Sequence, residues 1–229
     1  ATTVDAADID GDGDLDILAG VAEGDGRVKW FRNNGDSPPQ FDEVDLGPLQ
    51  PQDIGGVVFD ATPVDLDGDG ALDILAAFWL DPAAPAGHLV WYRNDGAPLP
   101  AFSAIPLPTP ANALTRIEQI ATGDIDLDGD VDIAAVSINL GSPTTPSTLV
   151  LWTNSGGPTP SFAPQVIDSG LQTPRSVAIG QLTPDPRPDI AVADELPGIV
   201  RAYRNDGGSP PVFTAATIAN VPGARDLLI

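Results

Sequence analysis

Aspartate recurs at alternating positions in three short segments of the sequence, at residues 8–16, 65–73 and 124–132. When each segment is numbered from one to nine, aspartate occupies positions one, three, five and nine in all three, and glycine occupies position six. Alternating carboxylates in a tight loop can point at a common centre. Glycine at position six permits a sharp turn, after which the backbone carbonyl at position seven can reach the same centre. The pattern therefore predicts a site for a hard cation.

The donors in these segments are oxygen atoms, which favours calcium over zinc or copper; magnesium ranks second because it keeps more of its waters. An EF-hand is excluded because alanine stands at position twelve (Ala19, Ala76 and Ala135), so the closing carboxylate comes at position nine. The alternative is a solvated acidic turn without an ion. It is disfavoured because each close pair of carboxylates costs up to about 4 kcal/mol at an effective dielectric constant of 20.

The acidic segments belong to a longer repeat. A fourth copy begins at residue 181, and the four starts lie 57, 59 and 57 residues apart. Each copy is followed by an aromatic segment that ends in Asn-x-Gly, such as VKWFRNNG at residues 28–35. In the fourth copy Pro186 replaces the glycine, and only Asp185 and Asp189 remain as carboxylates, so we expect it to bind no calcium.

Each repeat contains four short runs rich in Val, Ile, Ala and aromatic residues, separated by Gly, Pro, Asn and Asp, which is typical of strands joined by turns. In the fourth repeat the predicted strands are residues 176–180, 189–193, 198–203 and 212–218. The second run of each repeat is apolar without alternation, which predicts a strand covered on both faces. We therefore predict an all-β fold, a β-propeller of four-stranded antiparallel blades.

The repeats predict a single β-propeller domain or propeller segment over residues 1–229, with approximate repeats at 1–56, 57–115, 116–172 and 173–220. The remaining nine residues are similar to the first strand of a repeat, because ARDLLI at 224–229 matches RSVAIG at 175–180. We predict an extra strand from Val221 to Ile229. Such a strand can pair within the ring or with a neighbouring molecule, so a homo-oligomer or a filament is one expectation.

Charge and composition exclude several classes of function. The net charge of -23 repels nucleic acids and anionic membranes, so we expect no nucleic-acid partner. No apolar run approaches the roughly 18 residues that a membrane helix needs, so we expect no membrane insertion. Cysteine is absent, which excludes disulfides and thiolate metal sites. Methionine is absent even from position 1, so we expect a processed or excised piece, for which a removed signal peptide is one explanation.

Candidate catalytic groups are sparse. The single histidine, His88, is expected in an exposed loop, and no serine or threonine has a histidine and aspartate framework, so we expect no enzyme activity. Trp30, Trp91 and Trp152 recur at one point of three repeats, where packing between blades is favoured over a set of sugar-stacking platforms.

Arginine recurs directly before the asparagine of the Asn-x-Gly motif in three repeats, as Arg32, Arg93 and Arg204. In so acidic a chain we expect these side chains to pair with neighbouring aspartates.

The motif DxDxDGxxD, followed by an apolar strand and then by W-[FY]-R-N-[ND]-G, resembles the FG-GAP/VCBS repeat family over the whole chain. The resemblance implies propeller blades, an extracellular location, and calcium in the loop between the first and second strands. Family propellers commonly have about seven blades, whereas this chain has four repeats. The ligand role carries over to positions one, three, five and nine, which are Asp8, Asp10, Asp12, Asp16, Asp65, Asp67, Asp69, Asp73, Asp124, Asp126, Asp128 and Asp132. The position-seven carbonyls belong to Asp14, Ala71 and Asp130.

The prediction is thus a calcium-stabilised module with three calcium ions, extracellular or at the cell surface, that acts as a structural or adhesive element. Two other functions stay open: a carbohydrate-binding, lectin-like module, for which exposed tryptophans would be diagnostic, and a non-catalytic part of a secreted enzyme. Glycans and surface proteins are accordingly the expected classes of partner besides calcium.

Overall fold

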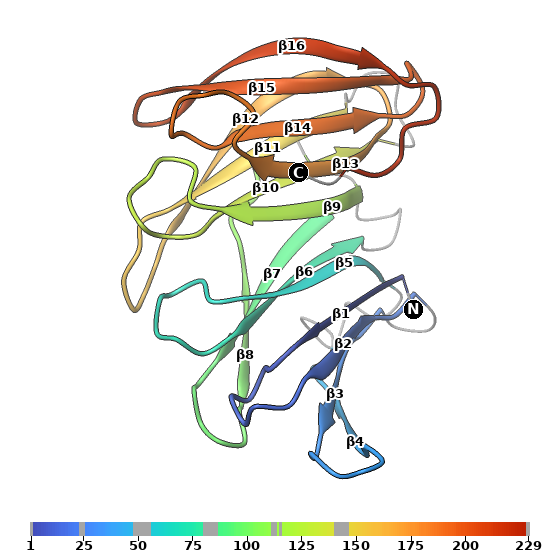
Figure 1. The fold of residues 1–229 in the computed structure, drawn as a ribbon, viewed down its shortest axis with the longest axis vertical. Coiled ribbons are helices and arrows are strands. Elements are labelled where there is room, and N and C mark those ends of the chain that lie inside the picture. The colour runs from blue at the N-terminus through green and yellow to red at the C-terminus, as the bar shows by residue number, and fades with distance from the viewer. Residues whose placement is uncertain are drawn as a thin grey trace. The chain divides into compact units, whose positions relative to one another are not determined.

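A computed structural model describes residues 2–22, 26–47, 56–79, 87–110, 114, 116–139 and 147–227. Within these residues the chain forms sixteen β-strands and no helix, and the strands make four antiparallel sheets of four strands each (Figure 1). The predicted all-β fold with one four-stranded antiparallel sheet per repeat is confirmed. In the described part of the chain, no helix has the length and apolar character needed to cross a membrane.

Each sheet is a meander in which consecutive strands are neighbours. The first sheet contains β1 (Thr3–Ala7), β2 (Asp16–Gly20), β3 (Val28–Asn33) and β4 (Phe41–Asp45). The second contains β5 (Val57–Val64), β6 (Asp73–Trp79), β7 (Gly87–Asn94) and β8 (Phe102–Pro106). The third contains β9 (Arg116–Gly123), β10 (Asp132–Ile138), β11 (Ser147–Asn154) and β12 (Phe162–Leu171). The fourth contains β13 (Pro174–Gly180), β14 (Asp189–Asp194), β15 (Ile199–Gly207) and β16 (Val212–Asn220).

The chain divides into two compact units, residues 1–107 and 108–229, and each unit holds two sheets. Within each unit the first strands of the two sheets contact each other, β1 with β5 and β9 with β13. In the second unit this contact includes a hydrogen bond that the Val177 backbone N–H donates to Gln119 Oε1 at 2.8 Å. Within each unit the two sheets thus pack against each other through their first strands.

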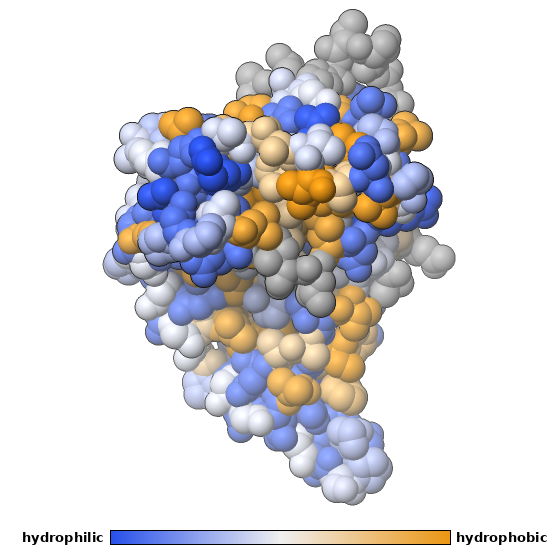
Figure 2. Space-filling model, turned by 45° about the horizontal axis from the view of Figure 1, so that its top comes forward, coloured by the Kyte–Doolittle hydropathy of each residue, from blue (hydrophilic) through white to orange (hydrophobic). Residues whose placement is uncertain are grey.

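One apolar core fills each unit. In the first unit Leu18 and Trp30 of the first sheet pack with Ile74 and Tyr92 of the second, and in the second unit an equivalent cluster joins the third and fourth sheets. Second strands are deeply buried: all seven residues of β10 and all six of β14 are buried. The prediction that second strands are covered on both faces is confirmed. Hydrophilic side chains cover much of the face drawn in Figure 2, in keeping with the net charge of -23.

The recurring tryptophans belong to these packed layers. Trp30, Trp91 and Trp152 are 2%, 3% and 0% exposed. The Trp30 ring lies edge-on to Phe102, with ring centroids 5.9 Å apart, and Trp152 Nε1 donates to the Pro108 carbonyl at 2.7 Å. The packing interpretation is therefore supported, and none of the three rings is exposed for stacking on a sugar.

The extra strand predicted from Val221 to Ile229 is wrong over residues 221–227, which form a turn and irregular backbone; residues 228 and 229 lie outside the described residues. Pro222 lacks a backbone N–H, and Gly223 takes a φ of 76°, so the chain turns after β16. The segment then runs along its own sheet, where the Leu227 N–H donates to Ser176 Oγ at 3.0 Å.

The expectation for His88 is also wrong. It lies in β7 opposite Phe78 and is half-buried, because the strand begins earlier than the sequence suggested. The Pro/Ala-rich residues 81–86 before it lie outside the described residues.

Truncation of a buried tryptophan tests the packing. We expect Trp152→Ala to lower the free energy of unfolding by about 3–5 kcal/mol, because it opens a cavity and removes the hydrogen bond to Pro108. Urea unfolding followed by circular dichroism measures the loss. Leu99→Ala is the control, because Leu99 is 71% exposed and its loss should cost less than about 0.5 kcal/mol. Equal losses in the two variants would contradict the role of Trp152 in the core.

Candidate metal centres

Four loops occupy the same place in the four sheets, between the first and the second strand. We call them the first to fourth loops, residues 8–16, 65–73, 124–132 and 181–189, so that position nine is the first residue of β2, β6, β10 or β14. The acidic segments therefore form short connections whose two ends are fixed by an antiparallel strand pair. For example, Ala7 pairs with Asp16 in the first sheet.

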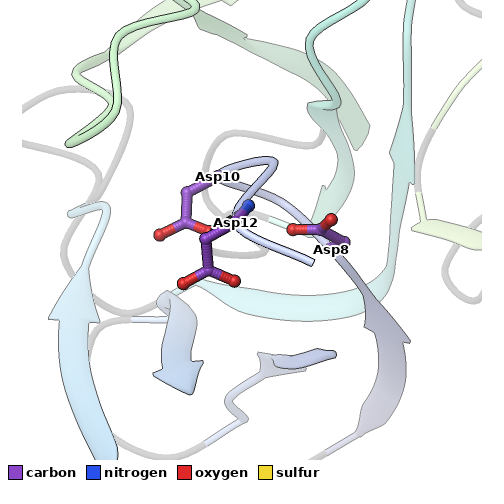
Figure 3. A group of neighbouring side chains, drawn as sticks. All are labelled: Asp8, Asp10 and Asp12. Atoms are coloured by element: carbon purple, nitrogen blue, oxygen red, sulfur yellow. Dashed lines mark hydrogen bonds between the residues drawn. The ribbon is translucent and has the colours of Figure 1, made fainter. Parts of the chain in front are cut away.

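Carboxylates converge in the first three loops. Each loop brings three aspartates together, each offering one oxygen atom, with these oxygens within 4.8 Å of one another. Figure 3 shows this in the first loop, where the Asp8 carboxylate points toward those of Asp10 and Asp12. The three groups are Asp8, Asp10 and Asp12; Asp65, Asp67 and Asp73; and Asp124, Asp126 and Asp132.

Glycine at position six has the left-handed backbone that the sequence led us to expect. Gly13, Gly70 and Gly129 have φ values of 96°, 91° and 97°, and no atom lies within 4 Å of where a Cβ would stand. Conformation rather than space therefore requires glycine here. The N–H of each glycine donates to the aspartate at position one, at 3.0, 2.9 and 3.0 Å, which turns that carboxylate into the loop.

Aspartate at position nine is bound on both oxygens by the backbone. Asp16, Asp73, Asp132 and Asp189 are all 0% exposed. In each, Oδ2 accepts the N–H of position two at 2.8–3.1 Å, and Oδ1 accepts the N–H of an asparagine at the third strand at 2.7–2.8 Å. The fourth loop keeps this arrangement although the rest of its motif is lost. This aspartate therefore holds the loop to the third strand independently of any ion.

The asparagine partner was missed by the sequence analysis as a functional residue. Asn33, Asn94, Asn154 and Asn205 each donate Nδ2 to the carbonyl at position eight of their own loop, at 3.0–3.2 Å. Two of them also reach the preceding loop, Asn94 to the Ile9 carbonyl at 3.1 Å and Asn205 to the Ile125 carbonyl at 2.7 Å. The signal was present in the sequence, because asparagine precedes x-Gly in all four repeats.

The acidic side chains at position seven lean away from the three-carboxylate groups. A Cβ on Gly35 would lie 2.5 Å from Asp14 Oδ2, and one on Gly156 would lie 1.9 Å from Asp130 Oδ2. In the first and third repeats the glycine of the Asn-x-Gly turn therefore makes room for the aspartate at position seven. In the second loop Ala71 stands there and leaves its Cβ 3.8 Å from the equivalent place on Gly96.

The recurring arginines pair with aspartates, as predicted, but with different ones. Arg32 pairs with Asp42 at 3.2 Å and Arg204 with Asp206 at 2.6 Å, both outside the loops. Arg93 instead enters the second loop, where its Nε lies 2.5 Å from Asp67 Oδ2. Position 153 in the third sheet is threonine.

The residues of the first three loops fit a divalent cation. Asp8 Oδ1 and Asp126 Oδ1 are buried oxygens without a hydrogen-bond partner, which is costly unless a cation meets them. Burial raises the pKa of Asp10 and of Asp126, and the adjacent carboxylates of Asp12 and Asp128 raise them further. A cation placed among these carboxylates would offset both the burial and the repulsion.

The fourth loop has a different counter-charge. Among the described residues, the groups of three acidic side chains that could hold a metal ion do not include it. Arg187 stands at position seven, and its guanidinium bonds Asp185 Oδ2 at 3.1 Å and the Asn205 carbonyl at 3.0 Å. A fixed cation from the chain itself thus lies in this loop.

The first and second loops also line a common open hollow of about 390 Å³. Asp8, Asp10 and Gly11 form one side, and Asp69, Gly70 and Ala71 form the other. Solvent ions therefore have access to both loops from one space.

Comparison with known protein families identifies the family of this chain. The model of a family described as FG-GAP-like repeat matches residues 8–76 and again residues 65–135. Each match begins at position one of a loop, so it contains an acidic loop and the strands that follow it. None of the curated proteins compared with the chain matches it.

The role assigned to position nine is testable in the fourth loop, where no ion is expected. Asp189→Ala leaves three backbone N–H groups unsatisfied, those of Leu182, Thr183 and Asn205. We expect a loss of about 3 kcal/mol or more in the free energy of unfolding, equal with calcium and with chelator. Asp185→Ala is the control and should cost about 1 kcal/mol or less, since its ion pair is partly exposed. A loss that appears only in calcium would contradict this role.

The buried aspartates also predict a pH dependence. Burial raises the pKa of Asp73 and of Asp132 from 3.8 to about 6, although backbone N–H groups partly offset the rise. Protonation therefore stabilises the folded state below about pH 4, and this contribution is lost as the pH rises through about 6. We expect the melting temperature of metal-free protein to fall between pH 5 and pH 7, measured by calorimetry.

Two comparisons make the pH experiment specific. Calcium needs ionised carboxylates, so the melting temperature with calcium is expected to rise over the same pH range. The Asp73→Asn variant is expected to show a weaker pH dependence without metal. A melting temperature that rises with pH in metal-free protein would contradict the effect of burial.

Proposed function

Because the chain belongs to the FG-GAP-like repeat family, we propose that it is a calcium-stabilised β-propeller module in which the first three loops each hold one calcium ion. The observation that carries the proposal is the convergence of three aspartates at the same place in three sheets, with oxygens within 4.8 Å of one another. Calcium is bound by oxygen ligands at 2.3–2.6 Å, so oxygens on opposite sides of one ion lie about 5 Å apart.

Each ion would be held by the aspartates at positions one, three and five, together with position nine and the carbonyl at position seven. The bound ion supplies two positive charges to a loop that otherwise concentrates four or five carboxylates. Without it, the first loop's carboxylates accept hydrogen bonds from backbone N–H groups, such as the Gly13 N–H to Asp8, and in the second loop Arg93 adds an ion pair with Asp67. We therefore assign the ion a structural role, in which it joins the first and second strands of a sheet.

The sheet arrangement within each unit supports the propeller. Each sheet is a four-stranded meander, and the first strands of the two sheets in a unit lie side by side, as they do in neighbouring propeller blades. We propose that the four sheets are blades.

We further propose that the module lies outside the cell and acts as a structural or adhesive element. Two observations support this proposal. Three candidate metal sites lie in loops that connect the first and second strands, and the net charge of the chain is -23. Affinity tests the location, because extracellular calcium modules have dissociation constants of about 10⁻⁴–10⁻³ M, whereas cytosolic sensors bind at about 10⁻⁷–10⁻⁵ M. Isothermal titration calorimetry that gives submicromolar constants for every site would contradict an extracellular role.

Removal of metal tests the proposal directly. A site at 100 times its dissociation constant adds about 2.7 kcal/mol to the free energy of unfolding, so three sites add about 8 kcal/mol. We expect a large fall in melting temperature when excess EDTA replaces calcium, measured by scanning calorimetry. An unchanged melting temperature would contradict a structural role of the ion.

The number of ions is tested separately by native mass spectrometry. We expect three bound calcium ions, and two in each of the single variants Asp8→Asn, Asp65→Asn and Asp124→Asn. Asp185→Asn, in the fourth loop, is the matched control and should retain three.

A further inference from the structure

We infer that the second loop is the weakest of the three calcium sites, because the guanidinium of Arg93 is held on two of its carboxylates. This inference rests on the proposed function and adds an order of filling to it. It starts from one position of the repeat, the residue before the asparagine of the third strand, which is Arg32, Arg93, Thr153 or Arg204.

Arg93 is bound to the inside of the second loop. Its Nε lies 2.5 Å from Asp67 Oδ2, and its Nη2 lies 3.8 Å from Asp69 Oδ2. These aspartates stand at positions three and five. The Asp67 side chain is 0% exposed, so this ion pair is shielded from solvent on its acidic side and is screened less than a surface pair.

Within the described residues, the first and third loops have no such ion pair between arginine and a loop carboxylate. Arg32 forms its ion pair with Asp42, its partner across β3 and β4, although its charge also partly offsets the rise that burial causes in the pKa of Asp10. Its counterpart in the third sheet, Thr153, carries no charge. A resident guanidinium on the carboxylates is thus particular to the second of the three acidic loops, within the residues that the structure describes.

The residue at position seven also makes the second loop less negative than the first and third. Aspartate stands there in the first and third loops, but alanine, Ala71, stands there in the second. The first and third loops therefore carry five carboxylates, whereas the second carries four and adds the positive charge of Arg93. The position-seven carboxylate is not assigned as a ligand, but its negative charge close to the loop favours a bound cation, whereas a like charge beside the ion opposes binding.

In the fourth loop an arginine at a different position, position seven, also pairs with a loop carboxylate. Arg187 stands at position seven there and pairs with Asp185 at position five, while the buried Asp189 keeps its backbone partners. An arginine can therefore take the place of an external cation without altering the frame of the loop. The second loop is intermediate: Arg93 contributes a positive charge, but the loop keeps all four of its aspartates.

Calcium titration of the full chain tests the order of filling, with native mass spectrometry and calorimetry as readouts. For the unaltered chain we expect two ions to bind first and a third to bind on the order of tenfold more weakly. Asp65→Asn should abolish the weak step, whereas Asp124→Asn should abolish a strong one. Three ions of equal affinity, or a weak step that disappears with Asp124→Asn instead, would overturn the inference.

Arg93→Thr introduces the residue of the third sheet and isolates the charge. We expect the weak step to strengthen on the order of tenfold, and Arg93→Lys to leave it weak because the charge remains. Arg32→Thr is the matched control and should change the affinity of the first site much less than Arg93→Thr changes that of the second, because Arg32 is ion-paired outside its loop. In metal-free protein Arg93→Thr should lower the melting temperature, because the buried Asp67 carboxylate then loses its ion-pair partner. A weaker third ion in Arg93→Thr would mean that Arg93 orients Asp67 for calcium, which contradicts the inference.

The two proposals fail in different ways. If the unaltered chain binds no calcium at millimolar concentration, the proposed function fails. If it binds three ions without a weak step, only the order of filling fails.

Discussion

The carboxylate at position nine is the constraint on which the rest of each sheet depends. It is fully buried, and a buried charge is tolerated only when its oxygens are bound. In every sheet one oxygen accepts an N–H from the loop and the other accepts the asparagine N–H at the third strand. This carboxylate therefore joins the loop, the second strand and the third strand. By holding the loop backbone, it also positions the aspartates at positions one to five.

This frame, the buried position-nine aspartate with its backbone partners, separates two tasks that the motif combines. Position nine fixes the backbone, and it does so equally in the fourth loop, where Asp185 is the one other acidic position that remains. Positions one and three converge in all three acidic loops, together with position five in the first loop and position nine in the second and third. Asp8 and Asp126 each retain a buried oxygen without a hydrogen-bond partner. The frame thus supplies the geometry, and a bound cation would supply the counter-charge that the frame lacks.

The sequence predicted the sheets, the loops and the acidic groups because their determinants are local: apolar runs, turn residues and glycine at position six. It did not predict contacts that join distant segments. The bond from Asn94 to the Ile9 carbonyl spans 85 residues, and the choice of Asp67 by Arg93 but Asp42 by Arg32 depends on side-chain directions. The tail resembled a strand by composition, but the turn at Pro222 and Gly223 ended the pattern.

The four loops form a series in which the same backbone holds different balances of charge. The first and third carry five carboxylates, the second carries four with an arginine upon them, and the fourth carries two with an arginine in place. The fourth loop has a positive charge from the chain itself, whereas in the first loop the proposed calcium ion would supply it. Because all four loops share the buried aspartate, the difference lies in the source of the positive charge and not in the fold. On the proposed function, the side chains around each loop would therefore set the calcium dependence of its sheet, one repeat at a time.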